Sequence, residues 1–367
     1  MKVALVIGTR PQIIKSAPII HAACGRSEVD LQVVHTGQHY DYEMSRLFFN
    51  ELDLPDPVVN LGVGSGSHAW QTGKMMIGLE KSFLDLEPDV VLVPGDTNST
   101  LAAALAAVKL HVPVAHVEAG ARSFDMRMPE EVNRRLTDHC SRLLFAVSEN
   151  CVRNLLSEGI AEERIALTGD TMYESLQRHL TEVLRDKALG ELGLTPEEYA
   201  VLTVHRPENV DEPRRLKRIM EAMIGLEGLT IVFPCHPRTE TRLRETGLLD
   251  KVSRAENIRL IKPVGYYRML NLMKNARMVF TDSGGMQKEA FWLKTPCITL
   301  RESTEWVETV KMGVNMLVGS DPKSIREATV RVLYEENLKE RISEALNPYD
   351  EGGVANRMLD VLCNFLI

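Results

Sequence analysis

The amino-acid sequence predicts an α/β protein made of two doubly wound domains. The first observation is that short apolar runs alternate with amphipathic stretches, the βαβ pattern of a parallel sheet covered by helices on both faces. The second is that this pattern stops at residues 171–199 and then begins again. The third is that polar residues and glycines follow the apolar runs, where ligands bind in such sheets.

The apolar runs of the first half predict strands buried on both faces, because such strands consist of nearly continuous Val, Ile and Leu. They lie at residues 3–7, 31–34, 90–93, 114–117, 143–147 and 165–167. The amphipathic stretches between them, such as residues 101–110 and 131–140, predict helices. These elements define a first domain at residues 1–170.

A charged stretch at residues 171–199 predicts mostly helical structure and the connection to a second domain, since Gly190, Gly193 and Pro196 interrupt it. Strands follow at residues 200–204, 230–234, 258–261, 278–280, 298–300 and 316–318. The second domain is expected at residues 171–351. Two such domains would face each other across a cleft, with ligands at the carboxyl ends of their strands.

Size and charge limit the possible functions. A chain of 367 residues is long enough for two α/β domains with separate cores. Its content of 44% hydrophobic and 26% charged residues is ordinary for a globular protein. The net charge of −8 argues against a general nucleic-acid-binding protein, but it is compatible with a local basic pocket for an anion.

Three features favour a cytoplasmic protein without a membrane partner. No apolar run approaches the roughly 18 residues of a membrane span. The first strand begins so close to residue 1 that no signal peptide is expected. The six cysteines are scattered and form no C-x-x-C motif, which is typical of reduced thiols.

The segment at residues 278–289 predicts a binding site for an anion. An apolar run ends in Thr281-Asp-Ser-Gly-Gly285, and helix-forming residues including Glu289 follow. The free N–H groups of a helix N-terminus bind phosphate, and Ser283, Gly284 and Gly285 let a diphosphate approach the backbone. Glu289, about one turn into the helix, would accept hydrogen bonds from sugar hydroxyls. The alternative is a helix cap and turn without a ligand.

Polar residues follow the other predicted strands as well. They include cations, histidines and carboxylates: Arg10, Lys15, Asp96, Glu118, His205, Arg206 and His236. One polar residue after a strand is commonly a cap, but six such positions at one cleft favour a ligand site. Glu130 and Glu131 begin a predicted helix, where complementarity with the helix dipole is the alternative. The set suits chemistry on a diphosphate-linked small molecule, with carboxylates that exchange protons.

Several common motifs are missing. No G-x-G-x-x-G follows a strand, and residues 62–67 (GVGSGS) have serine in place of the last glycine. Gly73-Lys74 lacks the remaining residues of a P-loop. His116-Val-Glu118 is similar to part of a zinc deaminase signature, but the paired cysteines are absent, so His116 is expected to be a strand histidine. No metal site is predicted.

Taken together, the strand-end motifs resemble those of the non-hydrolysing UDP-N-acetylglucosamine 2-epimerases over essentially the whole chain. The matching segments are Gly8-Thr-Arg-Pro-Gln-Ile-Ile-Lys15, Thr36-Gly-Gln-His39, Gly95-Asp-Thr97, His116-Val-Glu-Ala-Gly120, Pro129-Glu-Glu-Val-Asn-Arg134, His205-Arg206 with Glu208-Asn209, His236-Pro237 and Thr281-Asp-Ser-Gly-Gly285. The resemblance implies the GT-B architecture of two Rossmann-like domains. It also implies a homodimer and a final helix, at about residues 352–367, that crosses back to the first domain.

The resemblance implies roles for individual residues. UDP-binding positions of the family match Arg10, Lys15, His205, Ser283, Gly284, Gly285 and Glu289, and His236 joins the substrate-binding set. Its acid and base carboxylates match Asp96, Glu118 and Glu130, with His205 as a further catalytic candidate. The implied reaction eliminates UDP from C1 as the C2 proton leaves, giving a 2-acetamidoglucal, and then adds UDP back with C2 protonated on the opposite face. No metal or nicotinamide cofactor is needed.

One segment departs from the common family pattern. An arginine that contacts the UDP-sugar in the family is Trp306 here, within Thr304-Glu-Trp-Val-Glu308, and a phenylalanine contact becomes Met269. The Trp306 segment and residues 123–130 are similar to a branch that acts on UDP-2,3-diacetamido-glucuronic acid. Arg127 would either bind the carboxylate of that sugar or form a surface salt bridge. UDP-N-acetylglucosamine is the first substrate expected, and the uronic acid is the alternative.

Gln38 and His39 match a pair near which some family members bind UDP-N-acetylglucosamine as an activator, so regulation is a hypothesis here. Three other classes share parts of this pattern. They are a GT-B glycosyltransferase with a UDP-sugar donor, a hydrolysing 2-epimerase and a non-catalytic UDP-sugar sensor. Exchange of solvent deuterium into C2 distinguishes the epimerase from the glycosyltransferase.

Overall fold

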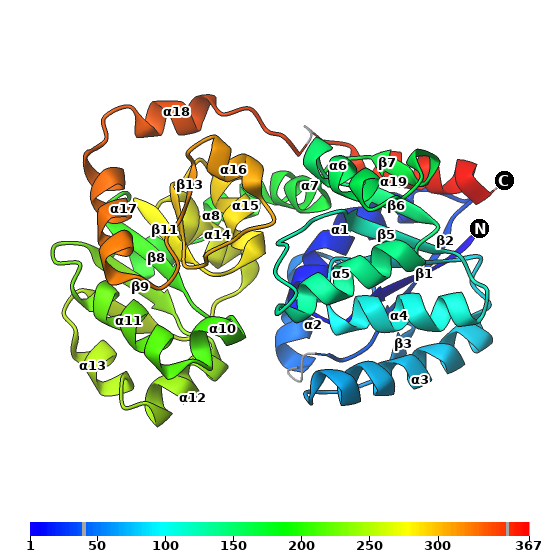
Figure 1. The fold of residues 1–367 in the computed structure, drawn as a ribbon, viewed down its shortest axis with the longest axis horizontal. Helices are drawn as coiled ribbons and strands as arrows, with labels where there is room; N and C mark the ends of the chain where they lie inside the picture. The colour runs from blue at the N-terminus through cyan, green and yellow to red at the C-terminus, as the bar shows by residue number, and fades with distance from the viewer. Residues whose placement is uncertain (39–41, 350–351, 367) are drawn as a thin grey trace. The chain divides into compact units, whose positions relative to one another are not determined.

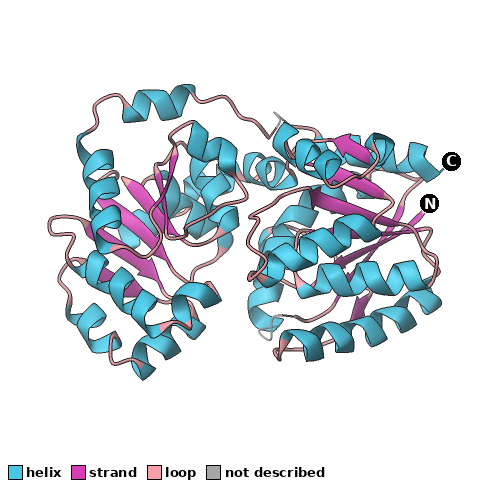
Figure 2. Ribbon diagram, in the orientation of Figure 1, coloured by secondary structure: helices cyan, strands magenta, loops and turns pink. Residues whose placement is uncertain are grey.

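Two units, each built around a parallel sheet, make up the chain in a computed structural model that describes residues 1–38, 42–349 and 352–366 (Figures 1 and 2). Unit 1 comprises Met1–Arg178 and Asn347–Ile367, and unit 2 comprises His179–Leu346. The boundary lies beyond the expected residue 170, because helix α7 (Thr171–Arg178) packs against α1 (Arg10–Cys24) and α19 (Val354–Leu366) of unit 1.

The described strands of unit 1 form a seven-stranded parallel sheet in the order β3-β2-β1-β4-β5-β6-β7. Their bounds are β1 Lys2–Ile7, β2 Asp30–His35, β3 Val59–Asn60, β4 Val90–Pro94, β5 Val114–Ala119, β6 Leu143–Ala146 and β7 Ile165–Leu167. Six of these strands were predicted from their apolar runs. The two-residue β3 was not, because an edge strand this short has no hydrophobic period to detect.

The helices of unit 1 cover both faces of this sheet. Their bounds are α1 Arg10–Cys24, α2 Tyr42–Glu51, α3 His68–Leu86, α4 Asn98–Lys109, α5 Pro129–Cys140, α6 Glu149–Ser157, the 3-10 helix Glu162–Arg164, α7 Thr171–Arg178 and α19 Val354–Leu366. Helices α3, α4 and α5 lie side by side, whereas α1 packs against α2, α7 and α19 (Figure 1). After β1, the strands β2 and β3 extend the sheet on one side, whereas after β4 the strands β5, β6 and β7 extend it on the other side. Right-handed crossovers therefore place α1 and α4 on opposite faces of the sheet.

The core of unit 1 combines small and branched side chains. Helix α4 buries Ala102, Ala103 and Ala107 completely, and they share one apolar cluster with Val91 and Val93 of β4. Alanine lets the helix backbone come close to the sheet and has the highest helix propensity. Thr97 caps the helix by accepting a hydrogen bond from Thr100 N, so α4 begins directly after the β4 segment that carries Asp96.

Unit 2 repeats the same topology with a six-stranded parallel sheet in the order β10-β9-β8-β11-β12-β13. The strands are β8 Tyr199–Thr203, β9 Thr230–Pro234, β10 Ile258–Ile261, β11 Met278–Thr281, β12 Cys297–Thr299 and β13 Asn315–Leu317. The helices are α8 Leu180–Arg185, α9 Ala188–Glu191, α10 Pro207–Val210, α11 Pro213–Ile224, α12 Pro237–Glu245, α13 Leu249–Arg254, α14 Tyr266–Lys274, α15 Gly284–Trp292, α16 Val307–Lys311, α17 Pro322–Tyr334 and α18 Leu338–Glu344. All six predicted strands are present within a residue or two.

The C-terminal segment returns to unit 1 through specific contacts. Asp170 N donates to Tyr349 O at 3.0 Å, and Arg26 of the loop after α1 pairs with Asp360 of α19 at 2.6 Å. Tyr349, Val354 and Leu359 are completely buried. The last helix is therefore part of the packing of unit 1. Within the described chain, no helix is long and apolar enough to cross a membrane.

Candidate functional site

Both sheets have the strand order in which ligands bind at a topological switch point, where successive connections diverge. In unit 1 this point lies between β1 and β4, and in unit 2 it lies between β8 and β11. The segments after these four strands carry most of the predicted residues. They are Arg10 and Lys15, Asp96, His205, and Ser283 with Gly284 and Gly285. Each unit therefore has its own polar cluster, here called the unit 1 cluster and the unit 2 cluster.

A buried ion pair lies at the centre of the unit 1 cluster. Lys15 Nζ of α1 is 2.6 Å from Glu118 Oε1, and the side chains are only 10% and 6% exposed. Glu118 has a φ of 70°, a left-handed conformation that is unusual for a non-glycine residue. The register between β5 and β6 shifts between Val117 and Ala119, so Glu118 occupies a bulge at the end of its strand. The bulge turns the carboxylate toward Lys15.

Asp96 is held by α5, the helix that follows β5. Arg134 Nη2 lies 3.0 Å from Asp96 Oδ2, and Asn133 Nδ2 donates to the main-chain oxygen of Asp96 at 2.9 Å. The Arg134 side chain is 4% exposed, but the Asp96 side chain remains 22% exposed. Asp96 is thus fixed in position while it stays accessible to a ligand.

The two adjacent glutamates of α5 differ in their surroundings. Glu131 is fully buried and accepts hydrogen bonds from Ser123 N at 2.8 Å and Ser123 Oγ at 2.9 Å. Arg134 Nη1 also lies 2.7 Å from Glu131 Oε2. Glu130 is only partly buried, in the first turn of the helix. The surroundings of Glu131 are those of a structural residue, and Glu130 is the better candidate for contact with a substrate.

His116 and Asp138 form a second buried pair behind these residues. His116 Nδ1 lies 2.6 Å from Asp138 Oδ1, and both side chains are completely buried. Arg122 Nη2 lies 2.6 Å from Asp138 Oδ2 and 2.8 Å from Glu158 Oε2. Burial alone would raise the pKa of Asp138, but His116 and Arg122 hold that pKa below its ordinary value. His116 is thus a strand histidine, as expected, and its contact with Asp138 joins β5 to α5.

The remaining predicted residues of unit 1 lie in different surroundings. The Arg10 guanidinium is 5.9 Å from the centre of the Phe48 ring. Gln38 Oε1 accepts from Ser99 Oγ at 2.7 Å, so its side chain joins the β2 and β4 segments. His39 lies outside the described residues. Arg127 pairs with Asp125 at 2.7 Å and its side chain is 91% exposed, which is the surface salt bridge named as an alternative.

The unit 2 cluster is built on the N-terminus of α15. Ser283 is the N-cap residue, and its hydroxyl accepts from Met286 N at 3.4 Å. Gly284 and Gly285 form the first turn, as predicted from the β11 segment. A Cβ atom on Gly284 would lie 3.4 Å from Trp306 Nε1 and 3.7 Å from Glu305 Oε2. Glycine at this position leaves the start of the helix without a side chain.

Asp282 anchors His205 beside that helix end. His205 Nδ1 is 3.0 Å from Asp282 Oδ1, and Asp282 also accepts from His205 N at 3.1 Å and Arg206 N at 3.0 Å. Burial raises the pKa of Asp282, whereas His205 and these donors lower it, and the net direction is downward. The His205 side chain remains 39% exposed, and its ring lies 6.3 Å from that of His236. The two histidines therefore belong to one cluster.

Trp306 is part of the packing beneath α15. It is 4% exposed, and Lys288 Nζ lies 3.8 Å from the centre of its ring. Lys288 itself is completely buried, and Glu289 is 5% exposed. Arg301 Nη2 pairs with Glu305 Oε1 at 3.0 Å in the same region. The residue that departs from the family pattern thus contacts the helix whose N-terminus forms the predicted anion site.

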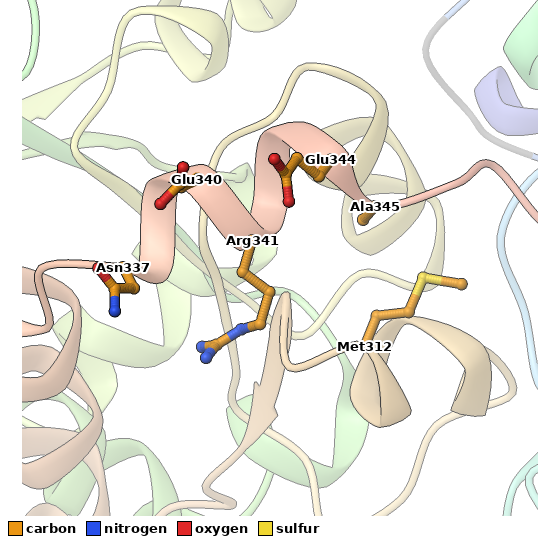
Figure 3. Close-up of a pocket in the computed structure, with 6 residues that line it drawn as sticks. All are labelled: Met312, Asn337, Glu340, Arg341, Glu344 and Ala345. Atoms are coloured by element: carbon orange, nitrogen blue, oxygen red, sulfur yellow. The ribbon is translucent and has the colours of Figure 1, made fainter.

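A pocket of about 470 Å³ lies away from these residues, between α18 and the end of α16. Figure 3 shows its lining residues, which are Met312, Asn337, Glu340, Arg341, Glu344 and Ala345. It includes no residue predicted for the site. Within the described ranges, no group of three or more His, Cys, Asp or Glu side chains has the arrangement needed to hold a metal ion.

Some residues that organise the clusters were not predicted as site residues. Arg134 and Asp282 bind the predicted site residues Asp96 and His205 directly, and Asp138 binds His116 and the main chain of Gly120, two residues after Glu118. The signal for Arg134 and Asp138 was present in the sequence. Glu130, Arg134 and Asp138 recur at every fourth position, and this spacing places them on one face of a helix.

Comparison with known proteins identifies similar chains over the full length. A family model described as UDP-N-acetylglucosamine 2-epimerase matches residues 21–363. A UDP-N-acetylglucosamine 2-epimerase of Methanocaldococcus jannaschii is 46% identical, over 99% of both chains. A UDP-2,3-diacetamido-2,3-dideoxy-D-glucuronate 2-epimerase of Pseudomonas aeruginosa is 41% identical, also over 99% of both chains.

Solved structures show the same fold. The crystal structure of the Methanocaldococcus jannaschii UDP-GlcNAc 2-epimerase in complex with UDP-GlcNAc and UDP matches with a TM-score of 0.93 and 45% identity. The match covers 99% of this chain and 100% of that one. The predicted fold class, two parallel-sheet α/β domains of the GT-B type, is therefore confirmed.

Proposed function

This chain belongs to the UDP-N-acetylglucosamine 2-epimerase family, and on that premise we propose that it interconverts UDP-N-acetylglucosamine and UDP-N-acetylmannosamine without hydrolysis. One observation carries the proposal beyond the family match. Three carboxylates with different surroundings lie at the end of β5 (Glu118) and on the segments that follow β4 (Asp96) and β5 (Glu130) of unit 1. A chemistry that removes a proton and returns one needs such separate carboxylates.

The unit 2 cluster is suited to the nucleotide. The N-terminus of α15 offers free N–H groups and the positive end of the helix dipole to a diphosphate. His205 and His236 add donors beside it. We assign UDP binding to the residues of this cluster, which include Ser283, Gly284, Gly285 and Glu289. We also assign Arg10 and Lys15 of unit 1 to the substrate-binding set.

The reaction we propose begins with departure of the nucleotide. The C1–O bond breaks with its electron pair going to UDP, and the cationic character that develops at C1 makes the C2 proton acidic. One carboxylate takes that proton as the C1=C2 double bond forms, giving a 2-acetamidoglucal. UDP then adds back to C1, and a second carboxylate protonates C2 on the opposite face. Stabilising the leaving diphosphate is therefore a main task of the site.

The surroundings of the three carboxylates support different roles in the reaction. Glu118 lies against the Lys15 ammonium group at the end of β5, and we assign it the role of a proton acceptor. Asp96 is paired with Arg134 and remains partly exposed. Glu130 has the partly exposed position of a group that contacts substrate. We assign the proton transfers to these three residues and count His205 as a fourth catalytic candidate.

A second substrate deserves a direct test. The Pseudomonas aeruginosa relative named for a diacetamido-glucuronate substrate is 41% identical to this chain. Trp306, which departs from the common family pattern, contacts Lys288 of α15, the helix whose N-terminus is the proposed UDP site. The alternative proposal is therefore a 2-epimerase for UDP-2,3-diacetamido-2,3-dideoxy-glucuronate.

Proton NMR in D2O with each nucleotide sugar in a separate tube tests both proposals. Deuterium at C2 and a manno-configured product are expected with UDP-N-acetylglucosamine. If these signals appear only with the uronic acid, UDP-2,3-diacetamido-2,3-dideoxy-glucuronate is the substrate. Turnover without C2 exchange would contradict elimination and favour a glycosyltransferase. A second saturable phase in the rate against substrate concentration would support activation by bound UDP-N-acetylglucosamine near Gln38.

We also propose a cytoplasmic homodimer. All six cysteines are free, which suits a reducing compartment. Trp70, Ile77 and Leu84 of α3 are 47%, 70% and 61% exposed. Their spacing of seven residues forms an apolar stripe that a second copy, related by two-fold symmetry, can cover. Light scattering on a sizing column is expected to give twice the chain mass of 41.2 kDa. Ile77→Lys is expected to shift that mass toward the monomer, with Val330→Lys on α17 as the control.

A further inference from the structure

A single buried carboxylate, Asp138 of α5, contacts the β5 segment that carries Glu118 and is linked through His116 to the segment that carries Asp96. Its Oδ1 atom lies 2.6 Å from His116 Nδ1, and its Oδ2 atom accepts from Gly120 N at 3.1 Å. His116 in turn places Nε2 at 2.7 Å from the carbonyl oxygen of Gly95. Gly95 precedes Asp96, and Gly120 follows Glu118 by two residues.

The hydrogen-bond partners of His116 determine where its protons lie. Gly95 O is a carbonyl oxygen and only accepts. Asp138 receives donors from Arg122 and Gly120 on its other oxygen, which is the arrangement of an ionised carboxylate. Both ring nitrogens of His116 therefore face acceptors, and each needs a proton to make its hydrogen bond. The geometry assigns the imidazolium form to this fully buried ring.

Two carboxylates, Asp138 and Glu158, lie among the cations around this ring. Arg122 forms an ion pair with Asp138, and Arg122 Nε also donates a hydrogen bond to Glu158 Oε1 at 2.9 Å. Arg135 and His139 of α5 lie 3.4 and 3.6 Å from Glu158. A cationic His116 thus faces the carboxylate of Asp138, which offsets part of the cost of burying its charge.

The backbone that this pair holds has an unusual conformation. Gly95 has a φ of 69°, Glu118 of 70° and Gly120 of 79°. This region is ordinary for glycine, but a non-glycine residue such as Glu118 persists in it only where the surroundings specify it, and such residues cluster at functional sites. The hydrogen bonds to Gly95 O and Gly120 N act on the segments that place Asp96 and Glu118. Arg134 and Asn133 of the same helix hold Asp96 from its other side.

We propose that the His116–Asp138 ion pair is a positioning unit for proton transfer, in which an imidazolium holds the Gly95–Asp96 segment and its carboxylate partner holds the turn after Glu118. This inference rests on the proposed function, since it concerns the same reaction. Neither residue is assigned contact with the substrate. Their effect is on the rate of the chemical step, because displacement of a reacting group by about 1 Å costs about a hundredfold in rate.

The charge state has a test that does not depend on activity. In protein labelled with 15N in the histidine rings, the His116 signals are assigned by their loss in His116→Gln. At about pH 7.5, where an exposed histidine is neutral, both His116 nitrogens are expected to carry slowly exchanging protons. Asp138→Asn is expected to remove that pattern. A neutral His116 ring in the wild-type protein would overturn the proposal.

The positioning role has a kinetic test. Asp138→Asn and His116→Gln are each expected to lower kcat about a hundredfold, with KM for the nucleotide sugar within about twofold of wild type. The double variant is expected to lose no more than either single variant, because the two residues act as one unit. Asp170→Asn is the matched control, since Asp170 is also buried in unit 1 but accepts from Met172 N. Asp170→Asn is expected to keep the wild-type kcat even if its melting temperature falls.

The outcomes separate this proposal from the proposed function. If the wild-type protein does not exchange C2 of either nucleotide sugar, the function fails and the ring signals still test the charge. If wild type turns over and Asp138→Asn, folded by circular dichroism, keeps its kcat, the positioning role fails alone. A fall in kcat equal to that of Asp170→Asn would assign the effect to stability and would equally overturn the proposal.

Discussion

Lys15 Nζ lies 2.6 Å from Glu118 Oε1, joining residues 103 positions apart in one buried ion pair. The pair depends on two backbone features. Lys15 lies in the second turn of α1, and Glu118 occupies a bulge with a φ of 70°. It places one carboxylate of the unit 1 cluster directly beside a cation.

Removing one partner of the pair is expected to cost more than removing both. Lys15→Met leaves a buried charge without compensation and should destabilise the protein by about 3–5 kcal/mol. Glu118→Gln should lower kcat by about 10²–10⁴-fold. The double variant should recover most of the stability and none of the activity. Thermal melts and kcat give both quantities, and Glu327→Gln, in an exposed Lys323–Glu327 pair, should change neither. Normal turnover by Glu118→Gln would contradict its catalytic role.

The adjacent glutamates Glu130 and Glu131 are expected to separate catalysis from stability. Glu130→Gln should fold with a native melting temperature and lose about 10²-fold or more in kcat. Glu131→Gln should lower the free energy of unfolding by about 3–5 kcal/mol, because Arg134 loses a buried partner. Melting and turnover of the two variants are compared side by side. If Glu130→Gln is fully active, the third carboxylate of the proposal must be sought elsewhere.

Two glycines are expected to respond differently to alanine. The Cβ of Gly284→Ala would have only ordinary contacts, 3.4 Å to Trp306 and 3.7 Å to Glu305. This variant should keep its melting temperature but bind UDP about tenfold more weakly, a loss of about 1.4 kcal/mol. Gly120→Ala should instead lose more than about 1 kcal/mol of stability, because its φ is 79° and its Cβ would lie 2.4 Å from Cys151 O. Titration calorimetry with UDP measures the first effect, and unchanged affinity would argue against a diphosphate at α15.

Acid is expected to destabilise both units through Asp138 and Asp282. The pKa of each carboxyl is lower in the folded protein than its ordinary value of 3.8. Their contribution to stability is therefore fully present above about pH 4, and it is lost as pH falls toward the folded pKa. Asp138→Asn and Asp282→Asn should flatten the decline of melting temperature on the acid side. Unchanged slopes in both variants would show that other carboxyl groups control acid unfolding.

Much of the fold follows from local pattern. Buried parallel strands such as 3–7 and 230–234 are nearly continuous in Val, Ile and Leu, so a window of a few residues reveals them. The anion site predicted at Ser283–Gly285 rests on an equally local pattern, because a strand, a glycine turn and a helix start are contiguous in the chain. The resemblance to the epimerase family rests on such contiguous motifs, and it therefore required no structure.

Other features depend on contacts between distant segments. The bulge that turns Glu118 toward Lys15 follows from the pairing of β5 with β6, and no residue type marks it in advance. The difference between Glu130 and Glu131 is likewise invisible in the sequence, since both are glutamates at one helix start. Packing of α5 buries Glu131 among its donors and leaves Glu130 partly exposed. Local pattern determines which elements form, whereas burial and partner choice arise only when elements far apart in the chain come together.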